Sequence, residues 1–145
     1  MANMPGDMRS FNAALVDEYR ANGGKLSGMM ANSRLLLLTT IGARSGQERV
    51  TPMGYGEDGG RLIVIASNNA AARHPDWYFN LLAHPDVTVE LGSERFAARA
   101  TAYTGEARAA ILPLVRERVP FFESQQAQTT REIPIVILER EVTDG

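Results

Sequence analysis

Cysteine is absent from the 145-residue sequence. Its absence excludes a disulfide framework, a thiolate metal site and a cysteine nucleophile, and it fits a reducing compartment. No apolar run approaches the roughly 18 residues that cross a bilayer, and the N-terminus lacks the apolar segment of a secretory signal. We therefore expect a soluble, cytoplasmic protein without a transmembrane segment.

A strong net charge is also lacking, since 15 Lys and Arg nearly balance 17 Asp and Glu, for a formal charge of −2. Binding to nucleic acid through phosphates needs a broad basic field, so we expect no nucleic-acid partner. His74 and His84 stand at opposite ends of a short predicted helix and should not converge on one ion, so we predict no metal site. The common nucleotide-binding and serine-hydrolase glycine motifs are absent.

The length fits a single domain over residues 1–145, and we expect residues 1–7 to be disordered. Helices are predicted at residues 8–21, 76–83 and 105–119, and strands at residues 35–41, 48–55, 61–66, 87–91, 95–103 and 133–138. The simplest arrangement of the first three strands is a meander. Six strands with few, short helices indicate the α+β class, as a small β-barrel or curled sheet wrapped by helices.

Two of these strands are apolar without alternation. Leu35–Ile41 and Leu62–Ile65 each read as strands buried on both faces, which places them inside a sheet or barrel. The last strand is short and apolar as well, so we expect it to insert beside earlier strands.

A basic turn follows the first strand. Gly42 and Gly46 bracket it, and glycine permits positive φ, so several N–H groups can face one concavity that attracts anions. Arg44 and Arg49 add fixed positive charge with forked donors, and Ser45 adds a hydroxyl. The pattern favours a site for phosphate or carboxylate, with an ordinary hairpin turn and solvated arginines as the alternative.

Two further segments carry candidate binding groups. Ser67 and Asn68 begin a small polar loop after the third strand, and Trp77 and Asn80 lie on the short helix that follows. Together with the basic turn, these segments could clasp a planar ring system with an anionic tail. Core and capping roles for Trp77 and Asn80 are the alternative.

The order of these motifs resembles the deazaflavin-dependent nitroreductase family, whose members are split-barrel oxidoreductases that use the 8-hydroxy-5-deazaflavin coenzyme F420. The match covers about residues 11–140. It is carried by Arg-Ala-Asn-Gly-Gly at 20–24, Leu-Leu-Leu-Thr-Thr-Ile-Gly-Ala-Arg-Ser-Gly-Gln-Glu-Arg at 36–49, Pro-Met at 52–53, His-Pro-Asp-Trp-Tyr-Phe-Asn-Leu at 74–81, His-Pro at 84–85 and Thr-Thr-Arg-Glu-Ile-Pro at 129–134.

The resemblance implies an α+β split β-barrel, similar to FMN-binding barrels, with about six largely antiparallel strands. It also implies hydride transfer from reduced deazaflavin to a planar, electron-poor acceptor such as a quinone, enone or nitroaromatic. An FMN-dependent reductase of the same fold and a non-catalytic deazaflavin-binding or carrier protein are the alternatives.

The family's basic turn holds the phosphate and acidic tail of the coenzyme, which assigns that role here to Arg44, Ser45, Gly46 and Arg49. By the same match, the pocket for the deazaflavin or its tail would be lined by Pro52, Met53, Ile65, Ala66, Ser67, Asn68, Trp77 and Asn80.

The chain departs from the family at two places. Members often carry Lys-Gly-Gly where this chain has Asn68-Asn69-Ala70, which removes a positive charge and implies a weaker or differently tuned tail site. Tyrosines that precede the last strand in quinone- and nitroimidazole-reducing members are Phe122 and Gln125 here, so the acceptor stays open. Tyr55, Phe122 and Gln125 are candidates to orient it. Monomer or homodimer, and a peripheral contact with the inner membrane face, are left open.

Overall fold

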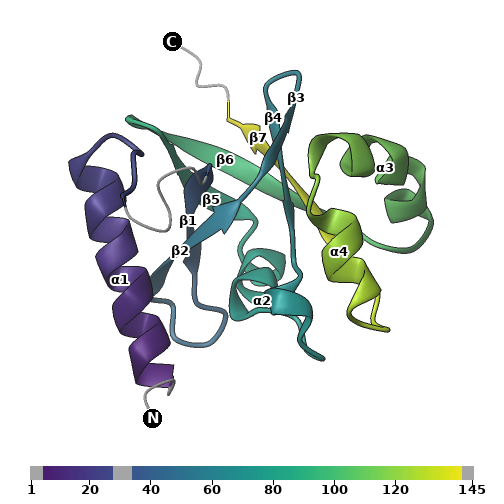
Figure 1. The fold of residues 1–145 in the computed structure, drawn as a ribbon, viewed down its shortest axis with the longest axis horizontal. Helices are drawn as coiled ribbons and strands as arrows, with labels where there is room; N and C mark the ends of the chain where they lie inside the picture. The colour runs from purple at the N-terminus through teal and green to yellow at the C-terminus, as the bar shows by residue number, and fades with distance from the viewer. Residues whose placement is uncertain (1–4, 28–33, 142–145) are drawn as a thin grey trace.

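The computed structural model describes residues 5–27 and 34–141 (Figure 1). Their elements, in chain order, are α1 (Pro5–Ala21), β1 (Leu35–Ile41), β2 (Glu48–Gly54), β3 (Gly56–Asp58), β4 (Arg61–Ile65), the 3₁₀ turn η2 (Asn68–Ala70), α2 (Asp76–Ala83), β5 (Asp86–Leu91), β6 (Glu94–Tyr103), α3 (Gly105–Arg118), α4 (Phe122–Ala127) and β7 (Ile135–Arg140).

The strands form one sheet in the order β2-β1-β5-β6-β7-β4-β3, with antiparallel neighbours throughout. The two edge strands, β2 and β3, are consecutive in the chain and are separated by Tyr55 alone. Two residues of backbone span at most about 7 Å, so the two edges of the sheet meet at this point. The sheet therefore curls into a half-barrel, which confirms the predicted α+β split barrel.

The predicted meander is wrong, because β4 pairs with β3 and β7 and makes no ladder with β2. The predicted strand 48–55 ends at Gly54, and a separate strand begins at Gly56. A Cβ on Gly56 would lie 2.4 Å from the carbonyl oxygen of Arg118, so only glycine lets the chain pass beneath the end of α3. This crossing between sheet edges accounts for a seventh strand. Helix α1 also begins at Pro5, inside the segment expected to be disordered, of which residues 1–4 lie outside the described residues.

The apolar strands are covered on both faces, as predicted. In β1, Leu36 and Leu38 pack in the barrel interior, whereas Leu37 packs beneath α1 against Val16 and Tyr19. In β4 and β7, alternate residues likewise face the interior or the cluster beneath α3 and α4. β7 lies between β6 and β4, as expected for an inserted strand. Because helices cover the outer face, these strands need apolar side chains at every position.

The segments that carry the polar motifs lie at one end of the barrel. The antiparallel ladders place the end of β1, the start of β2, the end of β4 and the start of β7 at this end. Helix α2 runs from β4 to β5 across it (Figure 1), with Tyr78 and Leu81 buried in the interior cluster. The turn 42–47, the loop 66–75 and the segment 128–134 therefore meet around α2.

Substitution of Gly56 by alanine is expected to unfold the protein more easily than substitution of Gly54. The Gly56 Cβ would meet backbone at 2.4 Å, whereas the Gly54 Cβ would meet the ring of Phe121 at 3.1 Å, and that half-exposed ring can move. Overpacking that cannot relax costs about 1–3 kcal/mol. Urea unfolding of Gly56→Ala and Gly54→Ala beside the wild type measures the difference, and equal midpoints for the two variants would contradict it.

Candidate functional site

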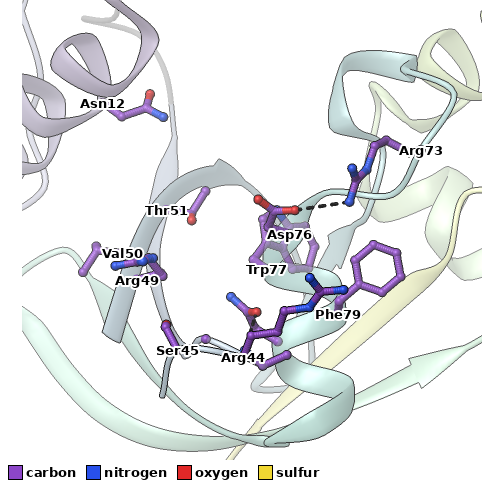
Figure 2. Close-up of a pocket in the computed structure, with 13 residues that line it drawn as sticks. Asn12, Arg44, Ser45, Arg49, Val50, Thr51, Arg73, Asp76, Trp77 and Phe79 are labelled. Carbon is purple, nitrogen blue, oxygen red and sulfur yellow. Dashed lines mark hydrogen bonds and ion pairs between the residues drawn. The ribbon is translucent and has the colours of Figure 1, made fainter. Parts of the chain in front are cut away.

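A cleft of about 1090 Å³ opens at the α2 end of the barrel (Figure 2). The turn after β1, the first half of β2, helix α1 and the start of α2 form its walls. It is lined by Asn12, Gly42, Ala43, Arg44, Ser45, Arg49, Val50, Thr51, Arg73, Asp76, Trp77, Phe79 and Asn80. Three segments far apart in the sequence, around residues 12, 42–51 and 73–80, thus share one cavity.

The basic turn is closed by its own backbone. The Gly42 N–H donates to the Gln47 carbonyl oxygen at 2.8 Å, and the Gly46 N–H donates to the Gly42 carbonyl oxygen at 3.0 Å. Gly46 has the expected positive φ, at +70°, whereas a Cβ on Gly42 would force the Ser45 hydroxyl to turn away and would lie 3.3 Å from the Gln47 carbonyl oxygen. These internal bonds use N–H groups that the sequence pattern directed at a ligand, so positive charge at the turn comes mainly from its arginines.

Asn80 fastens this turn to α2. Its Oδ1 accepts a hydrogen bond from the Ala43 N–H at 2.9 Å, and its Nδ2 donates to the Thr40 Oγ1 at 3.2 Å. Both Asn80 and Thr40 are buried. Asn80 therefore lines the cleft and also holds the turn in place. A position in the cleft and a structural role, which the sequence left as alternatives, thus apply to the same residue.

The charges around the cleft are unbalanced. Among the described residues, neither Arg44 nor Arg49 pairs with a carboxylate, and the only side-chain partner of Arg49 is the Gln47 Oε1 at 3.3 Å. Arg73 meets Asp76 at 3.6 Å, with both side chains largely exposed (Figure 2). Three guanidinium groups thus face one carboxylate, an arrangement suited to an anionic ligand.

An apolar wall stands beside these cations. Trp77 is half-buried, contacts the interior cluster and lines the cleft. Phe79 is 40% exposed and also lines it. The cleft therefore offers a charged part and an aromatic part, as a planar ring with an anionic tail requires.

The other predicted lining residues lie outside the cleft lining. Ile65 and Ala66 are buried in the core, and Met53 packs on the interior cluster from β2. The remaining ones are Gly46, Pro52, Ser67 and Asn68, in the turn, in β2 and in the loop after β4.

The three candidates to orient the acceptor are dispersed. Phe122 is 1% exposed within the cluster beneath α3, so its ring cannot touch an acceptor in this conformation. Tyr55 lies four strand residues, roughly 13 Å, past Thr51 of the cleft. Gln125, on α4, is half-buried, and its Oε1 is buried without a hydrogen-bond partner among the described residues.

The sequence reasoning missed Asn12, Arg73 and Asp76 as lining residues. The sequence did contain a signal for Arg73. It is a basic residue in a polar loop next to a helix start, and Arg44 and Arg49 are likewise basic residues in or beside a polar turn. Asn12 carried none, because only the packing of α1 along β2 brings it to the cleft.

Comparisons with known proteins agree with one another. The family model described as F420H(2)-dependent quinone reductase matches residues 12–140. An F420H(2)-dependent quinone reductase of Mycobacterium tuberculosis (strain H37Rv) is 33% identical over 126 residues, which cover 84% of this chain and 85% of that protein.

Two solved structures share the fold and part of the sequence. One, titled an F420-H2 dependent reductase (FDR-A), is 36% identical with a TM-score of 0.63, over 73% of this chain and 94% of that one. Another, titled a domain-swapped dimer, is 31% identical with a TM-score of 0.65, over 94% of this chain and 100% of that one.

Replacement of Asn80 by alanine should loosen the turn and destabilise the protein. The change removes both bonds to residues at the turn and leaves the buried Thr40 hydroxyl without its donor, a loss worth about 1–3 kcal/mol. Thermal unfolding of Asn80→Ala measures it. As a matched control, Gln47→Ala removes an exposed amide from the same turn and should stay within about 0.5 kcal/mol of wild type. An unchanged Asn80→Ala midpoint would show that the bridge adds nothing.

Proposed function

The chain belongs to the F420H(2)-dependent quinone reductase family and is therefore an oxidoreductase dependent on coenzyme F420, and we propose that the cleft at the α2 end holds the anionic tail of that coenzyme. Family membership bears out both the resemblance and the cofactor inferred from the motifs. The observation that carries the proposal is the pair of arginines, Arg44 and Arg49, that face the cleft without a carboxylate partner among the described residues.

The donors of the cleft fit a tail made of phosphate and carboxylates. Guanidinium groups bind such anions through two parallel N–H donors, and Arg44 and Arg49 are free to do so. Arg73 supplies a third group, because an exposed ion pair such as its contact with Asp76 contributes little and can be exchanged for a ligand. Arg73 thereby restores the positive charge that Asn68 removes from the family pattern.

When bound and reduced, the coenzyme supplies the hydride that a quinone-type acceptor receives. The arginines of the cleft would hold the tail, and Trp77 and Phe79 would offer an apolar surface to a planar part of the coenzyme. Asp76 is the single carboxylate among the described residues that line the cleft, and its side chain is 91% exposed to water, so we assign the proton that completes reduction to solvent.

The remaining site assignments stay predictions. Gln125 and Tyr55 lie outside the cleft lining, and the Gln125 Oε1 is buried, so their role in orienting the acceptor rests on the family match alone. The further cofactor contacts proposed from the family match are Gly46, Pro52, Met53, Ile65, Ala66, Ser67 and Asn68.

For the partners of the protein, the family indicates only the chemical class of the electron acceptor. A quinone-type small molecule fits the family as the acceptor. None of the described helices is long and apolar enough to cross a membrane. A monomeric or homodimeric state, a cytoplasmic location and a peripheral membrane contact stay predictions, although one solved relative is titled a domain-swapped dimer.

Binding of oxidised coenzyme F420 should quench the fluorescence of Trp77, the single tryptophan of the chain. We expect Arg44→Ala and Arg49→Ala each to raise the Kd about tenfold or more, since a hydrogen bond to a charged group contributes about 1.5–3 kcal/mol. Arg95→Ala removes an exposed arginine of β6 outside the cleft lining and should leave the Kd unchanged.

A parallel titration with FMN tests the main alternative. Tighter binding of FMN than of coenzyme F420 would contradict the proposal and favour the FMN-dependent reductase. Tight binding of reduced coenzyme F420 without turnover of any quinone would favour a carrier protein instead.

A further inference from the structure

The loop between β4 and α2 has a strained backbone. Asn68 and Ala70 both have positive φ, at +50° and +61°, although neither is a glycine. Asparagine adopts this left-handed conformation fairly readily, but it costs an alanine such as Ala70 about 1–2 kcal/mol and persists there only where surrounding contacts impose it. The same loop carries Arg73, whose side chain lines the cleft. Hydrogen bonds within the loop hold part of it, such as that from the Asn68 Nδ2 to the Arg73 carbonyl oxygen at 3.0 Å, and further contacts come from outside the loop.

Arg131, from the segment before β7, makes the required contacts. Its Nη2 donates to the carbonyl oxygens of Ala66 at 3.1 Å and Ser67 at 2.6 Å, and its Nε donates to that of Ala71 at 2.8 Å. Its Nη1 lies 2.7 Å from the Nδ1 of His74. One guanidinium thus binds the chain on both sides of the strained residues, across about sixty positions of sequence. Arg131 is absent from the cleft lining, so any effect on the cleft passes through the loop.

The contact with His74 constrains its protonation. A guanidinium can only donate, so the Nδ1 of His74 must accept and the ring must be neutral, with its proton on Nε2. Burial and the charge of Arg131 both lower the pKa of His74. The rings of Tyr78 and Phe79 pack beside it from α2, and burial raises the pKa of the Tyr78 phenol, which stays neutral.

Among the described contacts of His74, no carboxylate stabilises a protonated ring. Its charged neighbours in sequence, Arg73 and Asp76, pair with each other. Protonation of His74 would therefore place a second positive charge against Arg131 and remove the acceptor that Arg131 uses.

We propose that Arg131 is a positioning residue that clamps the strained loop 66–74, so that Arg73 and Trp77 form one wall of the cleft, and that the clamp is complete only while His74 is neutral. The effect on coenzyme binding rests on the proposed function, whereas the clamp itself does not. The clamp is therefore tested first in the free protein.

In the free protein, Arg131→Ala should accelerate amide hydrogen exchange in the loop 66–74 and raise the pKa of His74 toward its ordinary value, as followed by NMR of the ring. Arg131→Lys keeps the positive charge and one donor nitrogen in place of three, so it should give a smaller change in both readouts, and it replaces the alanine variant if that variant folds poorly. Unchanged exchange and an unchanged pKa in these variants would overturn the clamp, whatever the protein binds.

A strain-relief variant separates positioning from general stabilisation. Glycine adopts positive φ without cost, so Ala70→Gly added to Arg131→Ala should slow exchange in the loop and restore part of the lost coenzyme binding. Ala72→Gly is the matched control, because Ala72 lies in the same loop without positive φ, and it should restore neither. Equal rescue by both glycines would overturn the proposal.

Coenzyme affinity provides the remaining readout. Arg131→Ala should raise the Kd about tenfold, within the range by which residues outside a site modulate it. The pKa of His74 is lowered, so above its ordinary value of about 6.5 the ring is neutral and the clamp is complete. Affinity for the coenzyme should therefore fall only as the pH drops through the lowered pKa of His74. His74→Gln keeps an acceptor that does not titrate and should weaken this pH dependence.

The two proposals fail in different ways. If the wild type does not bind coenzyme F420 but the loop responds to Arg131→Ala, the proposed function fails and the clamp stands. If the wild type binds but the Arg131 variants bind equally well with unchanged loop exchange, the clamp fails alone.

Discussion

The meeting of the two sheet edges at Tyr55 is the constraint on which the rest of the structure depends. A seven-stranded sheet whose edge strands are one residue apart in sequence must curl, and curling gives it an interior that apolar side chains fill. It also gives the barrel two ends, one of which α2 covers. The cleft lies at that end because the β1–β2 turn, the loop after β4 and the segment before β7 all arrive there.

The electrostatics of the cleft contrast with those of the surface. Elsewhere, most of the described arginines pair with a carboxylate, as in the bidentate contact of Arg20 with Glu90 and the single contact of Arg61 with Asp58. The exceptions among the described residues outside the cleft are Arg95, Arg108 and Arg131. Around the cleft, Arg44 and Arg49 have no carboxylate partner among the described residues. Both side chains are exposed and solvated while no anion is bound, so they are available to an anionic ligand, as the proposed function requires.

Several features of the fold and of the candidate site could be predicted from local patterns, because each of these features depends on residues that are neighbours in sequence. Continuous apolar runs at β1 and β4 indicated strands covered on both faces, and the glycine-bracketed basic turn indicated anion binding. The break between β2 and β3, which leaves β4 to pair with β3 and β7, could not be predicted. It depends on the close passage of Gly56 beneath Arg118, and therefore on where α3 packs. The contacts of Arg131 were missed for the same reason, because its partners lie in the loop after β4, about sixty positions away in sequence.

The sequence by itself determined the class of fold, the approximate positions of six of the seven strands and of α1, α2 and α3, and the charge of the turn, because hydrophobic periodicity, glycine and arginine act over a few residues. It also carried enough motifs to identify the family and its coenzyme. Only the tertiary structure decided which strands pair, which cations remain free and which side chain holds the loop. Those outcomes depend on contacts between residues tens of positions apart, such as Arg131 with Ala66, which the folded chain alone brings within hydrogen-bonding distance.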